Sequence, residues 1–301
     1  MRPQTKKSEI GLVCESRAMR RFVTELENVA PSDMPVLIWG EPGVGKERAA
    51  RALHRCSGRG AEPFEVIRCS GLDGAALQAV LADALPRARS GSVLLDGVEE
   101  LDAAAQNELL RVLQSPLAIE TSGLSSRRLR HAPRWISNAA EDLDPLVRRG
   151  RLRRDLYHRL AAVRLHLPPL RTRGTDLPAL ATDLIAEQVN EGAAASVTID
   201  EEALTLLRGY PWPGNVREFA TVLTQAAWRA REGVLRAADL GDLLAPTALN
   251  AAVQIPLGTS LAIAEQILLR ATLAGFGGNK KRTADALGIT RRTLYLKLGR
   301  T

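Results

Sequence analysis

The sequence predicts an α/β domain built on a mainly parallel sheet, followed by a small all-helical unit. Five short apolar runs have the length of buried strands and alternate with stretches of helical periodicity. The runs are 35–39, 64–67, 92–95, 134–137 and 163–167. Strands that alternate with helices favour a parallel sheet with helices on both faces. With 301 residues, the chain is long enough for one large and one small domain.

The composition narrows the function classes. With 45% hydrophobic and 25% charged residues, the chain resembles a soluble globular protein. Its three cysteines follow neither a disulfide framework nor a zinc-site spacing, which favours a reduced, cytoplasmic protein without a structural metal. The longest uncharged run, 243–264, contains two prolines and is therefore interpreted as a linker rather than a membrane span. No membrane partner is expected.

The positive charge is concentrated near the C-terminus. Of the formal net charge of +7, +6 falls in residues 259–301, where eight Lys or Arg face only Glu265 and Asp285. A compact basic segment favours nucleic acid as a partner, although a solvated charged face would have the same composition.

Helical segments follow the Pro168-Pro169 break, at 176–190, 200–210 and 214–231, with no convincing strands. They indicate a small helical lid. The uncharged stretch 244–258 then separates this lid from a last helical unit. The predicted organisation is an α/β part over 10–172, the lid over 173–244, a linker over 245–258 and the last helical unit over 259–301.

The strongest chemical signal is G-E-P-G-V-G-K-E, which lies between a predicted strand and a predicted helix. Its glycines let backbone N–H groups turn toward phosphates, and the helix N-terminus adds partial positive charge. The lysine would reach the β and γ phosphates, while a purely structural glycine turn is the alternative. The predicted nucleotide-binding residues are Gly40, Glu41, Pro42, Gly43, Val44, Gly45, Lys46 and Glu47.

Magnesium is the expected companion of the nucleotide, here ATP. Glu47 stands where a Ser or Thr usually contacts the metal, so another carboxylate must contribute. Asp96 ends an apolar strand at the carboxyl edge of the sheet, which would place it beside the loop as the magnesium partner. Taken alone, an Asp in this place is more often a helix cap or a turn residue.

Several longer motifs resemble the AAA+ domain of sigma-54-dependent activators, or bacterial enhancer-binding proteins, followed by a Fis-type helix-turn-helix. The resemblance covers almost the whole chain. Its motifs are LVCESRAMRRF, GEPGVGKE, RALHRCS, ELLRVLQ, GRLRRDLYHRL, LPPLRTRGTDLPAL and YPWPGNVREF. The fold that it implies is a P-loop AAA+ parallel sheet with a helical lid, followed by a helix-turn-helix domain.

The resemblance also implies roles for three arginines. Arg153 and Arg159 are expected to act in catalysis as arginine fingers that reach the nucleotide of a neighbouring subunit in a ring. Arg217 is expected to be the sensor arginine of the lid. A guanidinium suits these roles because its planar fork matches phosphate oxygens and keeps its charge. A solvated basic face is the alternative for 148–159.

Three linked places in the chain depart from the family pattern. Gly97 follows Asp96, where family members have a glutamate that orients the attacking water. Arg68 replaces the asparagine that partners this glutamate, and 139–140 is Ala-Ala where the family has Thr and Asn, which leaves Asn138 displaced. We therefore expect ATP binding with impaired hydrolysis.

Two acidic residues leave an alternative open. Glu99 and Glu100 lie three and four positions beyond Asp96, and a shifted turn could bring one of them to the nucleotide.

The segment between Cys69 and Asp96 is a further departure. Family activators carry a long insertion here, with a GAFTGA-like loop that touches sigma-54, whereas this segment is far shorter and contains nothing comparable. Action independent of sigma-54 is therefore expected. No receiver domain precedes Leu12, so control by phosphorylation is not expected either.

The segment 279–298 is typical of two short helices around a tight turn. Ala284 would let the helices approach, Gly288 would supply the turn, and Leu287, Ile289, Leu294 and Leu298 would form the core. An ordinary helical hairpin is the alternative. The residues expected to contact double-stranded DNA are Lys280, Lys281, Thr290, Arg291, Arg292, Tyr295 and Lys297.

A helix over 260–273 carries an apolar stripe suited to a second copy, and the resemblance favours a dimer. The leading interpretation is a sequence-specific transcription regulator whose ATP-binding domain acts as an assembly or conformational switch, with RNA polymerase as a further candidate partner. A working ATPase that activates sigma-54 RNA polymerase is the main alternative. A replication-type or chaperone-like AAA+ loader is the third hypothesis.

Overall fold

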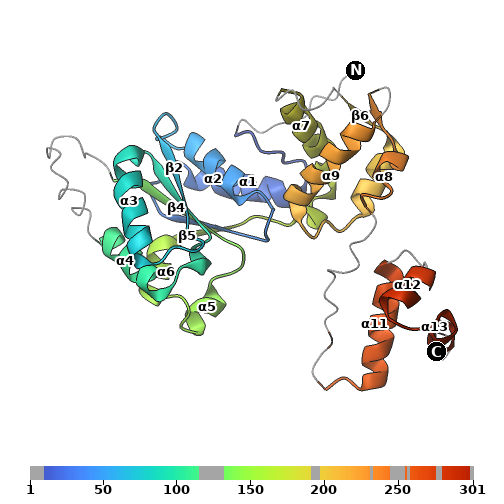
Figure 1. Cartoon of the computed structure of the whole chain (residues 1–301). Coiled ribbons are helices and arrows are strands. Elements are labelled where there is room, and N and C mark those ends of the chain that lie inside the picture. The colour runs from blue at the N-terminus through green and yellow to red at the C-terminus, as the bar shows by residue number, and fades with distance from the viewer. Residues whose placement is uncertain are drawn as a thin grey trace. The chain divides into compact units, whose positions relative to one another are not determined.

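The computed structural model describes residues 10–114, 132–190, 197–230, 233–244, 255, 258–275 and 280–298 (Figure 1). The chain divides into two compact units, Met1–Ala237 and Ala238–Thr301, and each is described by itself. The predicted linker over 245–258 falls almost wholly outside the described residues.

The first unit contains a five-stranded parallel sheet in the order β2-β3-β4-β1-β5. The strands are β1 (Val36–Trp39), β2 (Phe64–Arg68), β3 (Ser92–Asp96), β4 (Arg134–Ala139) and β5 (Val163–His166). All five predicted strands and the α/β fold class are therefore confirmed. Parallel order brings the carboxyl ends of the strands to one edge, where the loops after β1, β3 and β4 meet.

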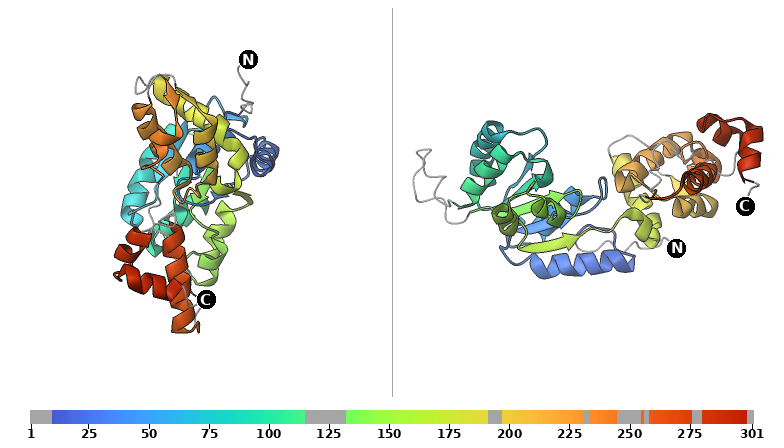
Figure 2. Two further views of the ribbon diagram at one scale, coloured as in Figure 1. Left: turned by 90° about the vertical axis from the view of Figure 1, so that its right-hand side faces the viewer. Right: turned by 90° about the horizontal axis from the view of Figure 1, so that it is seen from below.

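Helices cover both faces of the sheet, as Figure 2 shows for α1 on one side and α3 on the other. In β3, Val93 and Leu95 pack with α3, α4 and α6, whereas Leu94 packs with α1 and α2. This alternation follows from the two-residue period of a strand. The helices are α1 (Arg17–Val29), α2 (Lys46–Arg55), α3 (Gly74–Ala88), α4 (Ala103–Gln114), α5 (Asp144–Arg148) and α6 (Arg154–Leu160).

A single helix connects β2 to β3 within residues 69–96, all of which the structure describes. Asp73 caps the first turn of α3, because its side chain accepts a hydrogen bond from the Ala76 N–H at 2.8 Å. Leu77 and Leu81 of this helix are buried against the sheet. The short connection is thus a well-capped, packed helix rather than a protruding loop.

The lid contains the three predicted helices. They are α7 (Leu177–Asn190), α8 (Glu201–Gly209) and α9 (Asn215–Arg229). The expectation of no strands beyond Pro169 was wrong, because β6 (Thr198–Ile199) pairs in parallel with β7 (Val234–Leu235). Strands of two residues are too short to produce a recognisable alternation.

An aromatic cluster organises the lid. Trp212 is fully buried, donates its indole N–H to the Leu207 carbonyl at 2.8 Å and meets Phe219 edge-on at 4.7 Å between ring centroids. This cluster fixes the start of α9, and therefore the lid residues that face the α/β part.

The second unit contains α11 (Leu261–Gly275), α12 (Lys280–Ala286) and α13 (Arg291–Leu298), and the short α10 (Ala237–Leu240) lies at its boundary. The predicted helix pair is confirmed. Leu269, Ala284 and Leu294 form its core, with Leu287 and Ile289 partly buried against them. Gly288 has φ +65°, the left-handed turn geometry that favours glycine. The side chain of Leu298 is outside the described residues.

No helix in the described parts of the chain combines the length and apolar character needed to cross a bilayer.

Candidate functional site

The loop between β1 and α2 has the backbone of a phosphate-binding loop. Gly43 and Gly45 have φ values of +76° and +103°, in the region that side chains disfavour. The helix α2 begins at Lys46 directly after this loop. Since the first amides of a helix have no partner within it, they can bind an anion.

Lys46 bridges the loop that it ends. Its Nζ donates hydrogen bonds to the carbonyl oxygens of Gly40, at 2.7 Å, and Glu41, at 3.2 Å. Burial lowers the pKa of this ammonium, while the negative charges of Glu99 and Asp96 oppose that shift. The cation is therefore held over the loop in a partly desolvated position, where its interaction with a phosphate would be strong.

A cavity of about 430 Å³ joins this loop to the carboxyl edge of the sheet and to the lid. Predicted residues that line it are Pro42, Gly43, Gly45, Lys46, Glu47, Asp96 and Arg217. The cavity also contains Gly97, Glu99, Glu100, Asn138, Ala140, Val216 and Ala220. Gly40, Glu41 and Val44 are not among the lining residues, and Val44 is buried in the core.

The turn after β3 is held by the end of β4. Asp96 is in register with Asn138, and the Gly97 N–H donates to Asn138 Oδ1 at 2.8 Å. Gly97 has φ +79°, so this turn depends on a glycine. From the sequence, Asn138 was predicted only as a displaced residue of the family pattern. An asparagine at the end of an apolar run was the available signal for a structural role, and the structure shows that this asparagine is buried.

Glu99 lies in the cavity because the 3-10 helix Val98–Glu100 follows the Gly97 turn at once. Its Oε1 accepts a hydrogen bond from the Ala140 N–H at 2.6 Å. Its Oε2 is buried and has no hydrogen-bond partner among the described residues. Burial raises the pKa of this carboxyl, and the bond from Ala140 opposes the rise. The shifted-turn alternative therefore has direct structural support.

The lid contacts the phosphate loop through the first residues of α9. The Arg217 N–H donates to the Gly43 carbonyl at 3.1 Å. Asn215 is fully buried, and its Nδ2 lies 3.1 Å from both Glu41 Oε2 and the Pro42 carbonyl. A movement of the loop would therefore disturb hydrogen bonds to the lid.

Arg171 adds an ion pair to this contact. Its two terminal nitrogens lie 2.6 and 2.7 Å from the two carboxylate oxygens of Glu41. The hydrogen bonds from Arg171 lower the pKa of Glu41 to about 2, against the effect of burial and with help from Asn215.

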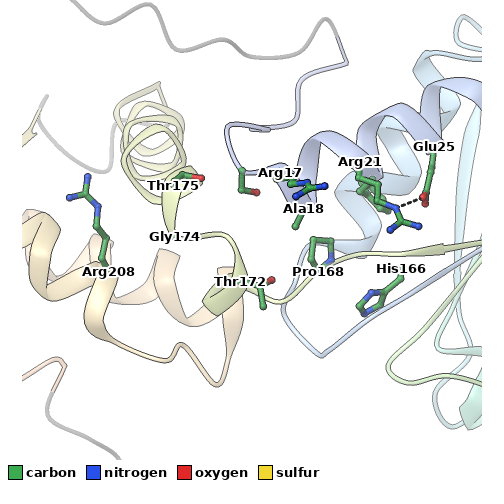
Figure 3. Close-up of a pocket in the computed structure, with 12 residues that line it drawn as sticks. Arg17, Ala18, Arg21, Glu25, His166, Pro168, Thr172, Gly174, Thr175 and Arg208 are labelled. Carbon is green, nitrogen blue, oxygen red and sulfur yellow. Dashed lines mark hydrogen bonds and ion pairs between the residues drawn. The ribbon is translucent and has the colours of Figure 1, made fainter.

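A second, larger cavity of about 1070 Å³ lies between α1, the segment after β5 and the lid (Figure 3). Arg17, Arg21 and Arg208 contribute basic side chains to it, and Arg21 is paired with Glu25 at 2.9 Å. The cavity contains none of the predicted phosphate-binding residues. The smaller cavity, which the phosphate-binding loop lines, is therefore the candidate nucleotide site.

The second unit exposes Lys280, Thr290, Arg291 and Tyr295. Lys280 Nζ lies 4.4 Å from the centre of the Tyr295 ring, and Lys297 Nζ is 2.5 Å from Glu265 Oε1. The Thr290 hydroxyl accepts the Thr293 N–H at 3.1 Å and caps α13. The side chains of Lys281 and Arg292 are outside the described residues.

Comparison with known proteins gives a consistent result along the chain. Residues 13–170 match the sigma-54 interaction domain, residues 171–254 the AAA+ ATPase lid domain, and residues 260–300 the bacterial regulatory proteins of the Fis family. The chain belongs to the family of bacterial transcription regulators with a sigma-54 interaction domain. It combines a nucleotide-binding AAA+ P-loop domain with a Fis-type DNA-binding helix-turn-helix.

Members of this family are similar over nearly the whole chain. Transcriptional regulatory protein ZraR of Salmonella typhi is 32% identical over 314 residues, which cover 99% of this chain and 70% of ZraR. Regulatory protein AtoC of Escherichia coli is 32% identical over 309 residues, covering 95% and 67%. NtrX from Brucella abortus in complex with ADP has a TM-score of 0.68 at 28% identity, covering 98% of this chain and 69% of that chain. The NtrX complex with ATP gives a TM-score of 0.67 at 27% identity, with the same coverage.

The two arginines that the family pattern assigns as fingers lie on or next to α6. Arg153 precedes α6, and its side chain is paired with Asp155 at 2.7 Å and bonded to Asn107 Oδ1 at 2.6 Å. Arg159 is exposed near the end of the helix. Neither lines the cavity of its own chain in the described structure. Their action on a neighbouring subunit stays a prediction.

Proposed function

We propose that this protein is a sequence-specific DNA-binding transcription regulator in which ATP, bound with magnesium, sets the assembly or conformational state of the AAA+ domain. The observation that carries the proposal is the shared lining of the 430 Å³ cavity: Lys46 from the phosphate loop, Asp96 from the sheet and Arg217 from the lid face the same space. A ligand held by all three elements would fix the lid against the α/β part.

The residues in the cavity fit a nucleoside triphosphate. The loop amides, the start of α2 and Lys46 supply positive potential for phosphates. Asp96 supplies a hard carboxylate oxygen of the kind that magnesium prefers, with water completing the coordination. Magnesium would neutralise phosphate charge there. The NtrX complexes with ADP and ATP support this assignment, because that protein shares the fold over 98% of this chain.

Self-association is part of the proposal. The fingers Arg153 and Arg159 act only if a neighbouring subunit presents its nucleotide to them. In the second unit, α11 leaves Leu261, Ile263 and Leu268 exposed by 88%, 56% and 43%, while Leu269 packs inward. Such an apolar surface suits a second copy of the same helix, so that a dimer reads two half-sites.

The deciding experiment combines ATP, assembly and DNA on the full chain. Oligomer size and footprints on genome-selected DNA are measured with and without magnesium ATP, and again for Arg292→Ala. We expect ATP to enlarge the assembly and Arg292→Ala to weaken DNA binding while the ATP response is kept. A wild-type protein that binds no DNA at low salt, where phosphate attraction is greatest, would overturn the proposal.

We further propose that the protein works without contacting sigma-54 through the segment between β2 and β3, because α3 is packed on the sheet and fills that connection. Crosslinking to sigma-54 in the presence of an ATP analogue tests this directly. The second candidate function, an active ATPase that remodels sigma-54 RNA polymerase, is favoured by the match of 13–170 to the sigma-54 interaction domain. An analogue-dependent crosslink would select it.

Slow hydrolysis also belongs to the proposal. Gly97 carries no carboxylate, and its left-handed backbone disfavours any side chain in that place. The change from glutamate to glycine therefore involves the backbone conformation of the turn as well as the loss of a side chain. We expect ATP to be bound firmly and turned over slowly.

A further inference from the structure

The strand-end side of the nucleotide cavity holds a carboxylate that the family pattern does not assign. Gly97 leaves the position after Asp96 without a side chain, and the chain then enters a 3-10 turn. This turn carries Glu99 into the cavity that also contains Lys46 and Asp96. An acidic group is thus present in this cavity, three residues beyond Asp96.

The two carboxylate oxygens of Glu99 have different surroundings. Oε1 is fixed by the Ala140 N–H at 2.6 Å, so the side chain is anchored to the end of β4. Oε2 is buried, and no hydrogen-bond donor pairs with it in the described structure. A buried acceptor without a donor is unfavourable unless a ligand or water supplies one. Oε2 is therefore the oxygen of this anchored carboxylate whose capacity to accept a hydrogen bond or a proton is unused in the described structure.

The end of β4 organises both parts of this arrangement. Asn138 fixes the Gly97 turn through its side chain, and two residues later Ala140 fixes Glu99 through its backbone N–H. The small residue at 140 is compatible with this role, because the contact needs only its amide. Gly97 and Ala140 lack the side chains of the family's catalytic pattern, and these same two positions support Glu99.

Glu100 is the competing acidic residue. It is exposed, and its Oε1 lies 3.2 Å from the point where a side chain at Gly97 would begin. The Ala140 N–H donates to Glu99. An exposed carboxylate keeps its water shell and is less preorganised than a buried, anchored one.

We propose that Glu99 is the carboxylate that positions and deprotonates the hydrolytic water in the slow turnover expected of this protein, an inference that rests on the proposed ATP binding. In this step, the water oxygen forms the new bond to the γ-phosphorus and the bond from that phosphorus to the oxygen of ADP breaks. One proton of the water moves to Glu99 Oε2, and the other stays on the phosphate. The products are ADP and inorganic phosphate.

The matched variants are Glu99→Gln and Glu100→Gln, which make the same charge change at adjacent positions of one turn. Equilibrium ATP affinity and steady-state phosphate release are measured on the same preparations of the full chain, with Lys46→Ala as the background. We expect Glu99→Gln to lower phosphate release by about 10²-fold, the typical effect of losing a positioned base, and Glu100→Gln to lower it much less. ATP affinity should be kept in Glu99→Gln, because the phosphate loop is unchanged.

Hydrogen exchange at the Ala140 amide separates catalysis from structure. The glutamine oxygen can still accept this N–H, so protection should persist in Glu99→Gln while turnover is lost. The assignment would be overturned if Glu99→Gln released phosphate as fast as wild type, or if Glu100→Gln lost as much activity as Glu99→Gln. It would also be overturned if Glu99→Gln lost both the protection of the Ala140 amide and its ATP affinity, or if the wild type released phosphate no faster than Lys46→Ala. Failure of the wild type to bind ATP would instead refute the proposed function itself, and this is seen in the binding measurement alone.

Discussion

The phosphate side of the nucleotide cavity is one continuous segment, whereas its strand-end side is assembled from two strands. On the first side, the loop and Lys46 follow each other in the chain, and Asn215 of the lid donates a hydrogen bond to the loop. On the second side, the β3 turn is held by contacts from the end of β4, through Asn138 and Ala140. Contacts to the ground state and contacts to the reacting water are therefore separate, and one set can change while the other is kept.

ATP binding should depend on the phosphate side of the cavity and not on its strand-end side. Lys46→Ala should weaken ATP affinity by about 10- to 100-fold, the range expected for losing a hydrogen bond to a charged group. Glu99→Gln should leave this affinity intact, because Glu99 lies on the strand-end side. Equilibrium titration with ATP and magnesium measures both variants. Wild-type affinity in Lys46→Ala would show that the phosphate loop is not the binding element.

The two sides of the cavity each contain a glycine with nearly the same backbone geometry, so the same substitution can be compared on both sides by its effect on stability. Gly43 and Gly97 have φ +76° and +79°, so an alanine costs about 1–2 kcal/mol of strain at either position. A Cβ at Gly43 would also lie 2.3 Å from the Gly214 carbonyl of the lid, whereas at Gly97 the nearest atom is the end of the Glu100 side chain at 3.2 Å. The backbone cannot move aside as that side chain can.

Gly43→Ala should therefore lower the thermal unfolding midpoint more than Gly97→Ala, and it should also weaken ATP binding by displacing the lid. Differential scanning fluorimetry of the full chain, with and without ATP, gives both quantities. Equal losses of stability in the two variants would mean that the lid does not pack on the loop as closely as described.

Sequence patterns were sufficient for the parts of this protein that depend on neighbours along the chain. The five strands, the phosphate loop and the helix pair around Gly288 are each encoded by apolar spacing and glycines within a short window. The predicted proximity of Asp96 to Lys46 followed from one further rule, that parallel strands end at one edge.

The patterns were insufficient where contacts join distant segments. Whether Glu99 enters the cavity depends on the hydrogen bond from Ala140, 41 positions away, which no local pattern contains. The pair of Glu41 and Arg171 joins positions 130 residues apart, so the sequence presented it as two unrelated charges. The β6–β7 pair was missed because two residues are too few to show alternation.

The smallest expected effect is a pH dependence of stability on the phosphate side. Arg171 holds the pKa of Glu41 at about 2, below its ordinary value of 4.5. A carboxyl with a lowered pKa stabilises the folded protein fully above its unfolded pKa, and this contribution is lost as pH falls from about 4.5 toward 2. Because the Glu41 side chain is 39% exposed, solvent screening limits the ion pair to less than about 1 kcal/mol.

Glu41→Gln should therefore be less stable than wild type at neutral pH, and the difference should shrink as pH falls through the window below 4.5. Urea unfolding at several pH values measures it, and the same substitution in an Arg171→Gln background is the control, because a double-mutant cycle isolates the pair. In that background the pH-dependent part should vanish, since the guanidinium that lowers the pKa is gone. A difference that stays constant with pH, or that persists without Arg171, would show that Glu41 contributes through Asn215 and loop packing rather than through its charge.

The strand-end side should show the opposite pH dependence. Burial raises the pKa of Glu99, so its titration acts on stability with the opposite sign. Glu99→Gln should therefore gain stability relative to wild type as pH rises.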